Sequence, residues 1–354
     1  MGTIKSLPSI SVVIPTHNGE AWIGDTLESV FTQTHLPDEV IVVDDASSDD
    51  TAQRVIDLAV DAPVPVHLIC QKVNSGAPAP VLNIGIARAT GELIAVLDQD
   101  DTFLPTKLEM QARALAADAG LSVVLSLFRR DNGYGALWDI MTARLRVRHL
   151  RRRMKSSNGI LQCDGSAALE AITRSSTNFF GGFPGFMFRR SAWERKGGFD
   201  ESFVVGADFE FLCWLCRQGI VGLVPEIHYQ RREHGANFSR NTGIRGHLDV
   251  VKALLRYTDV GNVPNTRHAF KKAIQHHLWD IARRLASAGH RQAASEVTAV
   301  LVEMTGASWR VPVQRLTIPA YVGYYRLIGR PWKISMEQAD EASELARVAA
   351  RQFV

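Results

Sequence analysis

The sequence has few cysteines and lacks any long apolar run, and both absences limit what the protein can be. Its 354 residues contain four cysteines, scattered as Cys70, Cys163, Cys213 and Cys216. Such dispersed cysteines do not suit a disulfide framework and favour a reducing compartment. No stretch approaches the roughly 20 apolar residues that span a bilayer, and no signal-peptide pattern follows the run that ends at Pro15. We therefore expect a cytoplasmic protein, with contact at most to the inner face of a membrane.

A strong charge of either sign is also lacking. The net charge is +3, which is too mild to imply a nucleic-acid partner. Cys213 and Cys216 have CxxC spacing, but no second pair completes a zinc site, so we interpret them as one buried helix face. With 46% hydrophobic and 22% charged residues, the chain has the composition of a folded protein with one large domain or two.

Strand-like and helical patterns alternate over the first hundred residues. Short, nearly continuous apolar runs of this kind are typical of strands buried on both faces of a parallel sheet. The alternation predicts an α/β fold with right-handed βαβ units in a doubly wound, mostly parallel sheet. The strand-like runs cover residues 10–15, 38–45, 64–71 and 91–100, and the helical patterns between them cover 19–34, 47–60 and 79–90.

In the C-terminal part of the chain, the apolar residues follow a helical repeat only, without strand-like runs between the helical segments. Segments 247–257, 267–289 and 291–304 show the 3.6-residue repeat of helices, and Gly289 stands where a helix would end. These patterns predict a helical C-terminal region over residues 241–354. A basic run at 142–155 is interpreted as a solvated face, with contact to an anionic membrane or acidic substrate as the alternative. An aromatic stretch at 318–333 fits packing against the helices or an interface.

Polar residues follow each of the four predicted strands. The carboxyl ends of parallel strands meet at one edge of a sheet, where ligands bind in folds of this class. These residues are Thr16, His17 and Asn18 after the first strand, Asp44 and Asp45 after the second, Asn74, Ser75 and Gly76 after the third, and Asp98, Asp100 and Asp101 after the fourth. The sequence therefore predicts a binding site on this edge.

The carboxylates Asp98, Asp100 and Asp101 stand within four positions. Carboxylates held close raise one another's pKa, so a tight cluster implies a bound cation or a chemical task. The alternative is an acidic turn that caps a helix beginning near Pro105.

In combination these segments resemble the family 2 glycosyltransferases of the GT-A fold. The resemblance covers about residues 8–240, through "SVVIPTHN", "VIVVDDASSDDT", "DQDDTFLPTKLE", "GFMFRRSAWERKGGFDESF" and "REHGANFS". It implies a metal-dependent, inverting enzyme that moves a hexosyl or deoxyhexosyl group from a nucleotide sugar to an acceptor hydroxyl. The implied divisions are a catalytic domain at 1–240, with a nucleotide-binding half at about 8–119 and an acceptor half at about 120–240, and a helical region at 241–354.

The resemblance also implies the partners. The donor is expected to be a UDP- or dTDP-sugar, and the acceptor a glycan or a lipid-linked glycan in cell-envelope or exopolysaccharide synthesis. The resemblance is also compatible with peripheral contact to a membrane and with a homo-oligomer.

For the donor, the resemblance implies that the loop after the first strand and the acidic pair after the second strand hold the base and ribose. A carboxylate accepts the imide N–H of uracil or thymine, which is the role implied for Asp45; its alternative is a cap for the 47–60 helix. The other implied residues of the base and ribose site are Pro15, Thr16, His17, Asn18 and Asp44. Asn74 and Gly76, after the third strand, are further candidates for donor binding.

"DQDD" resembles the DxD motif of the family, which holds a divalent cation. Carboxylate oxygens select Mg²⁺ or Mn²⁺, and Asp100 is implied as the principal ligand. By the same resemblance Asp98 faces the ribose and Asp101 lies beside the acceptor. His234 in "REHGANFS" is the second candidate ligand, and its alternative is a structural histidine.

The resemblance assigns the catalytic base to Asp208 in "GADFEF". An alcohol needs such a base because it is a weak nucleophile until its proton is removed. Its alternative is a helix cap, and Ala207 occupies a position where the family frequently has Glu. Leu82 likewise stands where the family often has Arg. The compensating cation is then Lys72, Arg189, Arg190 or the Arg231–Arg232 pair.

Two other functions fit parts of the sequence. Asp98, Asp100 and Thr102 match the DxDxT motif of haloacid-dehalogenase-like phosphatases, although that motif follows the first strand and here three βα units precede it. A degenerate domain that binds glycans or partners without turnover is the second alternative.

Overall fold

The computed structural model describes residues 6–131, 154–157, 159–174, 182–235, 237–238, 242–258, 264–305 and 334–353. Most of the basic run 142–155 and the whole stretch 318–333 lie outside these residues. The described chain forms two compact units: Met1–Ser202 with Trp214–His234, and Phe203–Cys213 with Gly235–Val354. The functional division near residue 240 stays a prediction.

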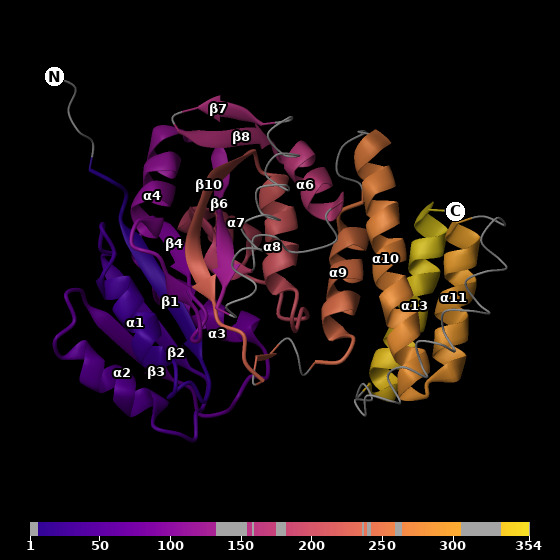
Figure 1. Ribbon diagram of the computed structural model, residues 1–354, viewed down its shortest axis with the longest axis horizontal. Helices are drawn as coiled ribbons and strands as arrows, with labels where there is room; N and C mark the ends of the chain where they lie inside the picture. Colours follow the sequence, from indigo (N-terminus) through magenta and orange to yellow (C-terminus); the bar gives the residue numbers. More distant parts are fainter. Residues whose placement is uncertain are drawn as a thin grey trace. The chain divides into compact units, whose positions relative to one another are not determined.

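The first unit is built on a sheet of ten described strands in the order β3-β2-β1-β4-β9-β6-β10-β8-β7, with β5 paired to β10 (Figure 1). The strands are β1 Ile10–Thr16, β2 Glu39–Asp44, β3 Val66–Cys70, β4 Leu93–Val96, β5 Thr102–Phe103, β6 Leu121–Arg130, β7 Lys155–Ser157, β8 Ile160–Asp164, β9 Phe186–Arg189 and β10 Ile220–Arg231. β1 pairs in parallel with both β2 and β4, β2 with β3, and β6 with β10. This arrangement confirms the predicted α/β class and the mostly parallel sheet.

One strand in the middle of the sheet runs against both of its neighbours. β9 pairs antiparallel with both β4 and β6. β9 is followed directly by the short helix α7 Arg190–Lys196.

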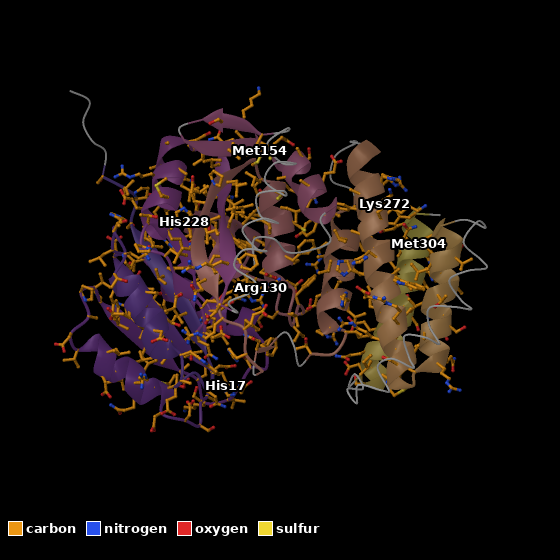
Figure 2. All side chains as sticks on the ribbon, viewed as in Figure 1. His17, Arg130, Met154, His228, Lys272 and Met304 are labelled. Carbon is orange, nitrogen blue, oxygen red and sulfur yellow. The ribbon has the colours of Figure 1, made fainter. Side chains whose placement is uncertain are left out.

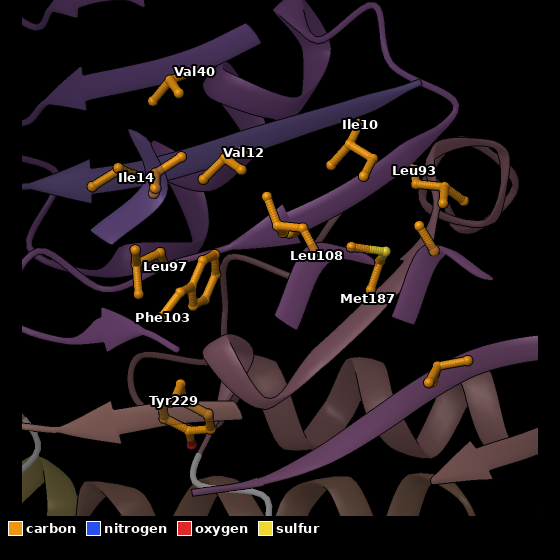
Figure 3. Close-up of a cluster of buried hydrophobic side chains, with 14 of the residues drawn as sticks. Ile10, Val12, Ile14, Val40, Leu93, Leu97, Phe103, Leu108, Met187 and Tyr229 are labelled. Carbon is orange, nitrogen blue, oxygen red and sulfur yellow. The ribbon is translucent and has the colours of Figure 1, made fainter. Parts of the chain in front are cut away.

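Helices cover both faces of the sheet. Apolar residues of α1 Ile23–Phe31, α2 Thr51–Ala59 and α4 Lys107–Ala117 pack with Val12 and Ile14 of β1 in one buried cluster (Figure 3). Helix α3 Pro78–Arg88 lies on the opposite face, because a Cβ added to Gly85 would come within 2.5 Å of Val13 Cγ1, the neighbour of Val12 and Ile14 along the strand. The unit also contains helix α6 Gly165–Arg174 and the 3₁₀ turn η1 Phe183–Gly185.

The second unit is helical. It contains α9 Arg245–Arg256, α10 Pro264–Ala288, α11 Arg291–Thr305, α13 Met336–Phe353 and the first residues of α8 Ala207–Cys216. The three helices predicted from periodicity are therefore present, and α13 was not predicted. Gly289 follows the end of α10 with φ 96°, as expected for a residue at a helix stop.

None of the helices in the described parts of the chain combines the length and the apolar composition that a membrane span needs. Cys213 and Cys216 are both buried in α8, in agreement with the interpretation of the pair as a packed helix face.

Candidate active site

The predicted polar edge forms where β1, β2, β3 and β4 end. Thr16 pairs with Asp44, and Asp44 pairs with Cys70, so the ends of these three strands lie in register. The residues that follow the strands therefore approach one another.

The loop after β1 is tied to the loops after β2 and β4. The side-chain oxygen of Gln99 accepts hydrogen bonds from Thr16 Oγ1 at 2.6 Å and from the His17 N–H at 2.8 Å. Nδ1 of His17 (labelled in Figure 2) lies 2.9 Å from the carbonyl oxygen of Asp45. Asn18 has a left-handed φ of 49° and accepts the Ser48 N–H at 2.8 Å. Pro15, the remaining candidate here, lies within β1.

The acidic pair after β2 is buried, with Asp44 4% and Asp45 5% exposed. Asp44 accepts a hydrogen bond from the Ser47 hydroxyl. Both carboxylate oxygens of Asp45 accept the Ser75 N–H at 3.0 Å, and one also accepts the Ser75 hydroxyl at 2.8 Å. The alternative role of Asp45 as a cap for the next helix is wrong.

The N-cap position of that helix is Asp50, whose side chain makes no capping hydrogen bond. α2 begins at Thr51, and its first N–H donates to Asp49 Oδ1 at 3.1 Å.

The loop after β3 closes onto the loop after β2. The Asn74 side-chain amide donates to the Asp45 carbonyl at 3.3 Å, and its oxygen accepts the Gly76 N–H at 2.6 Å. Gly76 has φ 73° and no atom within 4 Å of an added Cβ, so this turn is open to a ligand on that side.

The acidic turn after β4 is internally organised. The Asp101 N–H donates to the Asp98 carbonyl at 3.1 Å, and the Thr26 hydroxyl donates to the Gln99 carbonyl at 2.6 Å. Strand β5 follows this turn, and α4 begins only at Lys107. The alternative in which the cluster caps a helix near Pro105 is therefore wrong.

Asp100 and His234 are brought together within the first unit although 134 positions separate them in the sequence. His234 Nε2 lies 2.9 Å from Asp100 Oδ2, and the two side chains are 18% and 15% exposed. The His234 ring stacks on Trp22 with 4.1 Å between centroids and an interplanar angle of 15°. The stacking holds the imidazole in the orientation in which Nε2 faces the Asp100 carboxylate.

This pair fits a divalent cation that also binds substrate oxygens. Neighbouring ligands of an octahedral ion with bonds of about 2.1 Å are about 3.0 Å apart, close to the observed separation of Asp100 and His234. Within the described residues, no three His, Cys, Asp or Glu side chains gather as a complete protein-only metal site. The Asp100 carboxylate is a ligand of the kind that Mg²⁺ and Mn²⁺ prefer, and an octahedral ion of this type keeps positions for phosphate oxygens.

Asp101 is a buried carboxyl group in the same turn as Asp100. It is 3% exposed, and its carboxylate accepts the Arg232 N–H at 3.0 Å. Burial raises the pKa of Asp101 well above its ordinary value, and repulsion from Asp98 and Asp100 raises it further. A cation at the turn would relieve this repulsion.

Among the basic residues considered for the diphosphate, Arg231 interacts electrostatically with Asp98 and Asp101 of the acidic turn. Burial lowers the pKa of Arg231, but Tyr229, Asp101 and Asp98 raise it, and the net shift is upward. The Arg232 guanidinium instead pairs with Asp25 at 2.9 Å. Lys72 is exposed in the loop after β3.

Arg189 and Arg190 were wrong alternatives for this charge. β9 runs antiparallel to β4, so Arg189 pairs with Leu93 at the start of β4, whereas the acidic turn follows its end. Arg189 binds Glu92 at 3.0 Å, and Arg190 binds Glu194 at 2.6 Å.

The sequence interpretation missed several residues that organise the site. Gln99, Trp22, Thr26 and Ser75 hold the loops together, yet none was predicted to do so. Gln99 stands inside the "DQDD" motif and was visible there as a polar side chain between carboxylates. Trp22 and Thr26 gave no sequence signal beyond their place at the start of a helix.

Asp208 lies in the first turn of α8, and its segment belongs to the second unit. Its Oδ1 accepts the Phe209 N–H at 2.6 Å. Its role as the base stays a prediction.

Comparison with known sequences identifies one family. Residues 11–194 match the model of glycosyl transferase family 2. The succinoglycan biosynthesis protein ExoO of Rhizobium meliloti is 34% identical over 276 residues, which cover 75% of this chain and 73% of ExoO. Six other relatives match over 100–106 residues, and these matches cover only 14–42% of their lengths.

Solved structures share the fold. S. aureus TarS 1–349 in complex with UDP-GlcNAc has a TM-score of 0.61 at 16% identity, over 97% of this chain and 92% of that chain. The mannosyltransferase PcManGT of Pyrobaculum calidifontis, in complex with GDP-Man and Mn²⁺, has a TM-score of 0.57 at 20% identity, over 98% and 87% of the two chains. At these identities the likeness concerns the fold alone.

Proposed function

Because this chain belongs to glycosyltransferase family 2 and has the GT-A fold, we propose that it transfers a sugar from a nucleoside-diphosphate sugar to an acceptor hydroxyl, with inversion and with a bound Mn²⁺ or Mg²⁺. The observation that carries the proposal is the Asp100–His234 pair, 2.9 Å apart on the acidic turn that Gln99 joins to the loop after β1.

In this proposal the nucleoside lies against the loops after β1, β2 and β3. Asp45 accepts the imide N–H of the base through lone pairs that Ser75 leaves available, since each carboxylate oxygen accepts more than one hydrogen bond. Pro15, Thr16, His17 and Asn18 shape the base and ribose pocket. Asp44, Asn74 and Gly76 support the loops around it, and Asp98 binds the ribose.

Asp100 and His234 would hold the cation, and Arg231 adds a fixed positive charge near the diphosphate. The bound ion supplies a Lewis acid that neutralises the leaving diphosphate. Asp101, buried under the turn, holds segment 231–234 in place through the Arg232 N–H; its contact with the acceptor remains part of the proposal.

Asp208 acts as the base in a single displacement. The acceptor oxygen forms a bond to the anomeric carbon while the bond from that carbon to the diphosphate oxygen breaks. The hydroxyl proton passes to the Asp208 carboxylate, and the diphosphate leaves with the electron pair. The step is redox-neutral and needs only the donor and the acceptor as substrates.

The relatives support a polysaccharide acceptor. The name of ExoO refers to succinoglycan biosynthesis, and TarS and PcManGT were solved with UDP-GlcNAc and GDP-Man. We propose a UDP-, dTDP- or GDP-sugar as donor, a glycan or lipid-linked glycan as acceptor, and action in the cytoplasm at the inner face of the membrane. The family assignment leaves the phosphatase alternative without support.

Turnover and binding in three variants test the proposal. A panel of UDP-, dTDP- and GDP-sugars is screened for thermal stabilisation with Mn²⁺, and the donor that stabilises most is used to measure nucleoside-diphosphate release. Asp208→Asn should abolish release and retain donor binding, Asp100→Asn should lose Mn²⁺-dependent stabilisation, and the exposed control Asp61→Asn should match wild type. Donor binding without turnover in the wild-type protein would instead favour the binding-only alternative.

A further inference from the structure

Helix α9 holds the segment that carries Asp208. Asp249, Lys252 and Arg256 stand at positions i, i+3 and i+7 of α9, which places them on one helix face. Within the second unit, this face contacts the chain on both sides of Asp208.

The contacts occur at three points along residues 203–210. Lys252 Nζ and the Arg256 guanidinium lie 4.7 and 5.0 Å from the centre of the buried Phe203 ring. On the other side of Asp208, Glu210 accepts Arg256 Nη1 at 3.0 Å and the Tyr257 hydroxyl at 2.6 Å. The segment is therefore anchored before and after the residue.

Asp249 supplies the contact next to Asp208. One of its carboxylate oxygens accepts the Val205 N–H at 2.7 Å and the Gly206 N–H at 3.0 Å. Gly206 is the N-cap of α8, because its carbonyl accepts the first helical hydrogen bond, from the Glu210 N–H at 2.9 Å. Asp249 thus binds the amides at the start of the helix whose first turn contains Asp208.

The fit at this point is close. Asp249 is fully buried, and a Cβ added to Gly206 would lie 2.8 Å from the Asp249 Cβ, so only glycine allows this approach. Burying a carboxylate is costly unless it is hydrogen-bonded, and here two amides and the positive end of the α8 dipole offset part of the cost. The other oxygen, Oδ1, is buried without a hydrogen-bond partner in the described part of the chain. Burial raises the pKa of Asp249 despite these bonds.

We propose that Asp249 is a positioning residue for the transfer reaction: it holds the Val205–Gly206 turn so that α8 presents Asp208 to the acceptor. The helical C-terminal region then serves the catalytic step through α9. This inference rests on the proposed function, since it takes Asp208 as the base.

The alternative is that Asp249 only stabilises α8. Kinetic constants separate the two roles, because a shift of about 1 Å in a catalytic group costs up to about a hundredfold in rate. Loss of stability alone lowers the amount of folded enzyme and leaves the kcat of the folded fraction unchanged.

The test uses the full chain and four variants. Asp249→Ala removes the acceptor, and Gly206→Ala forces the turn away from α9. Asp249→Asn keeps one oxygen in place for both amides. Val297→Ala removes buried volume from α11 and serves as a destabilised control with an intact turn. We measure Tm, the Kd of UDP and GDP with Mn²⁺, and kcat from nucleoside-diphosphate release per folded enzyme.

Asp249→Ala and Gly206→Ala should lower kcat by about tenfold to a hundredfold, with nucleotide Kd within about twofold of wild type. Asp249→Asn should keep kcat near wild type, and Val297→Ala should lower Tm without changing kcat. If Asp249→Ala does not fold, Gly206→Ala and Asp249→Asn give the same contrast.

A wild-type kcat in Asp249→Ala or Gly206→Ala overturns the inference. Asp208→Asn distinguishes the cause: if it is inactive, only the positioning role has failed, and if it is fully active, the base assignment has failed as well.

Discussion

At the scale of single residues, the Gln99 amide is the link between the acidic turn and the loop after β1. It accepts the Thr16 hydroxyl and the His17 N–H and donates to the His17 carbonyl at 3.1 Å. A Cβ at Gly19 would meet Gln99 Oε1 at 2.4 Å, so the loop is folded around this side chain. Gln99 therefore couples two loops that sequence separates by about eighty residues.

We expect Gln99→Ala to weaken nucleotide binding about tenfold. Each lost hydrogen bond contributes about 1 kcal/mol, and a loop that is no longer held must be ordered by the ligand. Calorimetry with UDP and GDP in Mn²⁺ measures the change. Gln53→Ala on the exposed face of α2 is the matched control, and equal affinities in both variants would contradict the role of Gln99.

Trp22 orients His234, the second candidate metal ligand. Its indole stacks on the His234 ring and restricts the rotation by which Nε2 could leave Asp100.

Trp22→Leu should lower Mn²⁺ affinity by about tenfold, because groups that orient a ligand contribute about ten- to a hundredfold to metal binding. Calorimetry with Mn²⁺ and nucleotide measures the affinity. Fluorescence gives a second readout, since paramagnetic Mn²⁺ beside Trp22 should quench the emission of the wild type more than that of the variant. A Trp279→Phe control removes a tryptophan in α10, and quenching that depends on Trp279 instead would refute the assignment.

At the scale of elements, α4 carries a lysine that is buried in the first unit. Lys107 is fully buried, and its Nζ donates to Gln111 Oε1 at 2.6 Å. Gln111 in turn donates to the carbonyls of Val124 and Gly185, which ties α4 to β6 and η1. Burial lowers the pKa of Lys107 from 10.5 to about 7, and burial with the nearby Lys107 lowers the pKa of His228 to about 4.

The lowered pKa of Lys107 predicts a pH dependence of stability. Between its folded pKa of about 7 and its ordinary 10.5, the unfolded chain binds a proton that the folded chain does not. The free energy of unfolding should therefore rise with pH across this window, by up to about 1.4 kcal/mol per pH unit. Urea unfolding at several pH values between 7 and about 10 measures the slope.

The control for this prediction is a pair of methionine variants. Lys107→Met should lose this part of the slope, whereas Lys272→Met, which replaces an exposed lysine on α10 (Figure 2), should keep it. Parallel slopes in all three proteins would show that Lys107 stays charged in the folded state.

At the scale of the whole molecule, the two units contribute different parts of the proposed chemistry. The first contains the loops and the Asp100–His234 pair, and the second contains Asp208 on a segment bound by α9. Donor binding is thus expected to order the loops of the first unit and to leave the helices of the second unit unchanged.

Hydrogen exchange should show this pattern. UDP or GDP with Mn²⁺ should slow exchange in residues 16–19, 45–48, 74–76 and 98–101, because ordering of these loops removes their local opening. Peptides from α11 and α13 should exchange as in the free protein. Omitting Mn²⁺ should reduce protection mainly at 98–101. Protection confined to the helical unit would contradict the predicted donor site.

Much of the fold followed from local pattern. Apolar runs such as residues 10–15 and 38–45 and the helical repeats after residue 243 were assigned correctly, because burial on one face or both imposes a period that sequence displays. The positions of Asp44, Asp45 and the "DQDD" turn at the ends of strands were predicted for the same reason, because short stretches of sequence show where a strand ends and a turn begins. Element boundaries were less certain, since the predicted helix at 19–34 is α1 over Ile23–Phe31.

The sequence by itself determined the α/β class, the family and the loops that form the candidate site. Tertiary structure alone decided which side chains meet: Asp100 with His234 across 134 positions, Asp249 with Gly206 across 43, and Arg189 at the far end of β4. The physical reason is that such contacts depend on strand order and direction. The antiparallel direction of β9 places Arg189 away from the acidic turn, and the position of β10 in the sheet brings the segment after it to Asp100. No local periodicity in the sequence encodes the order or the direction of these strands.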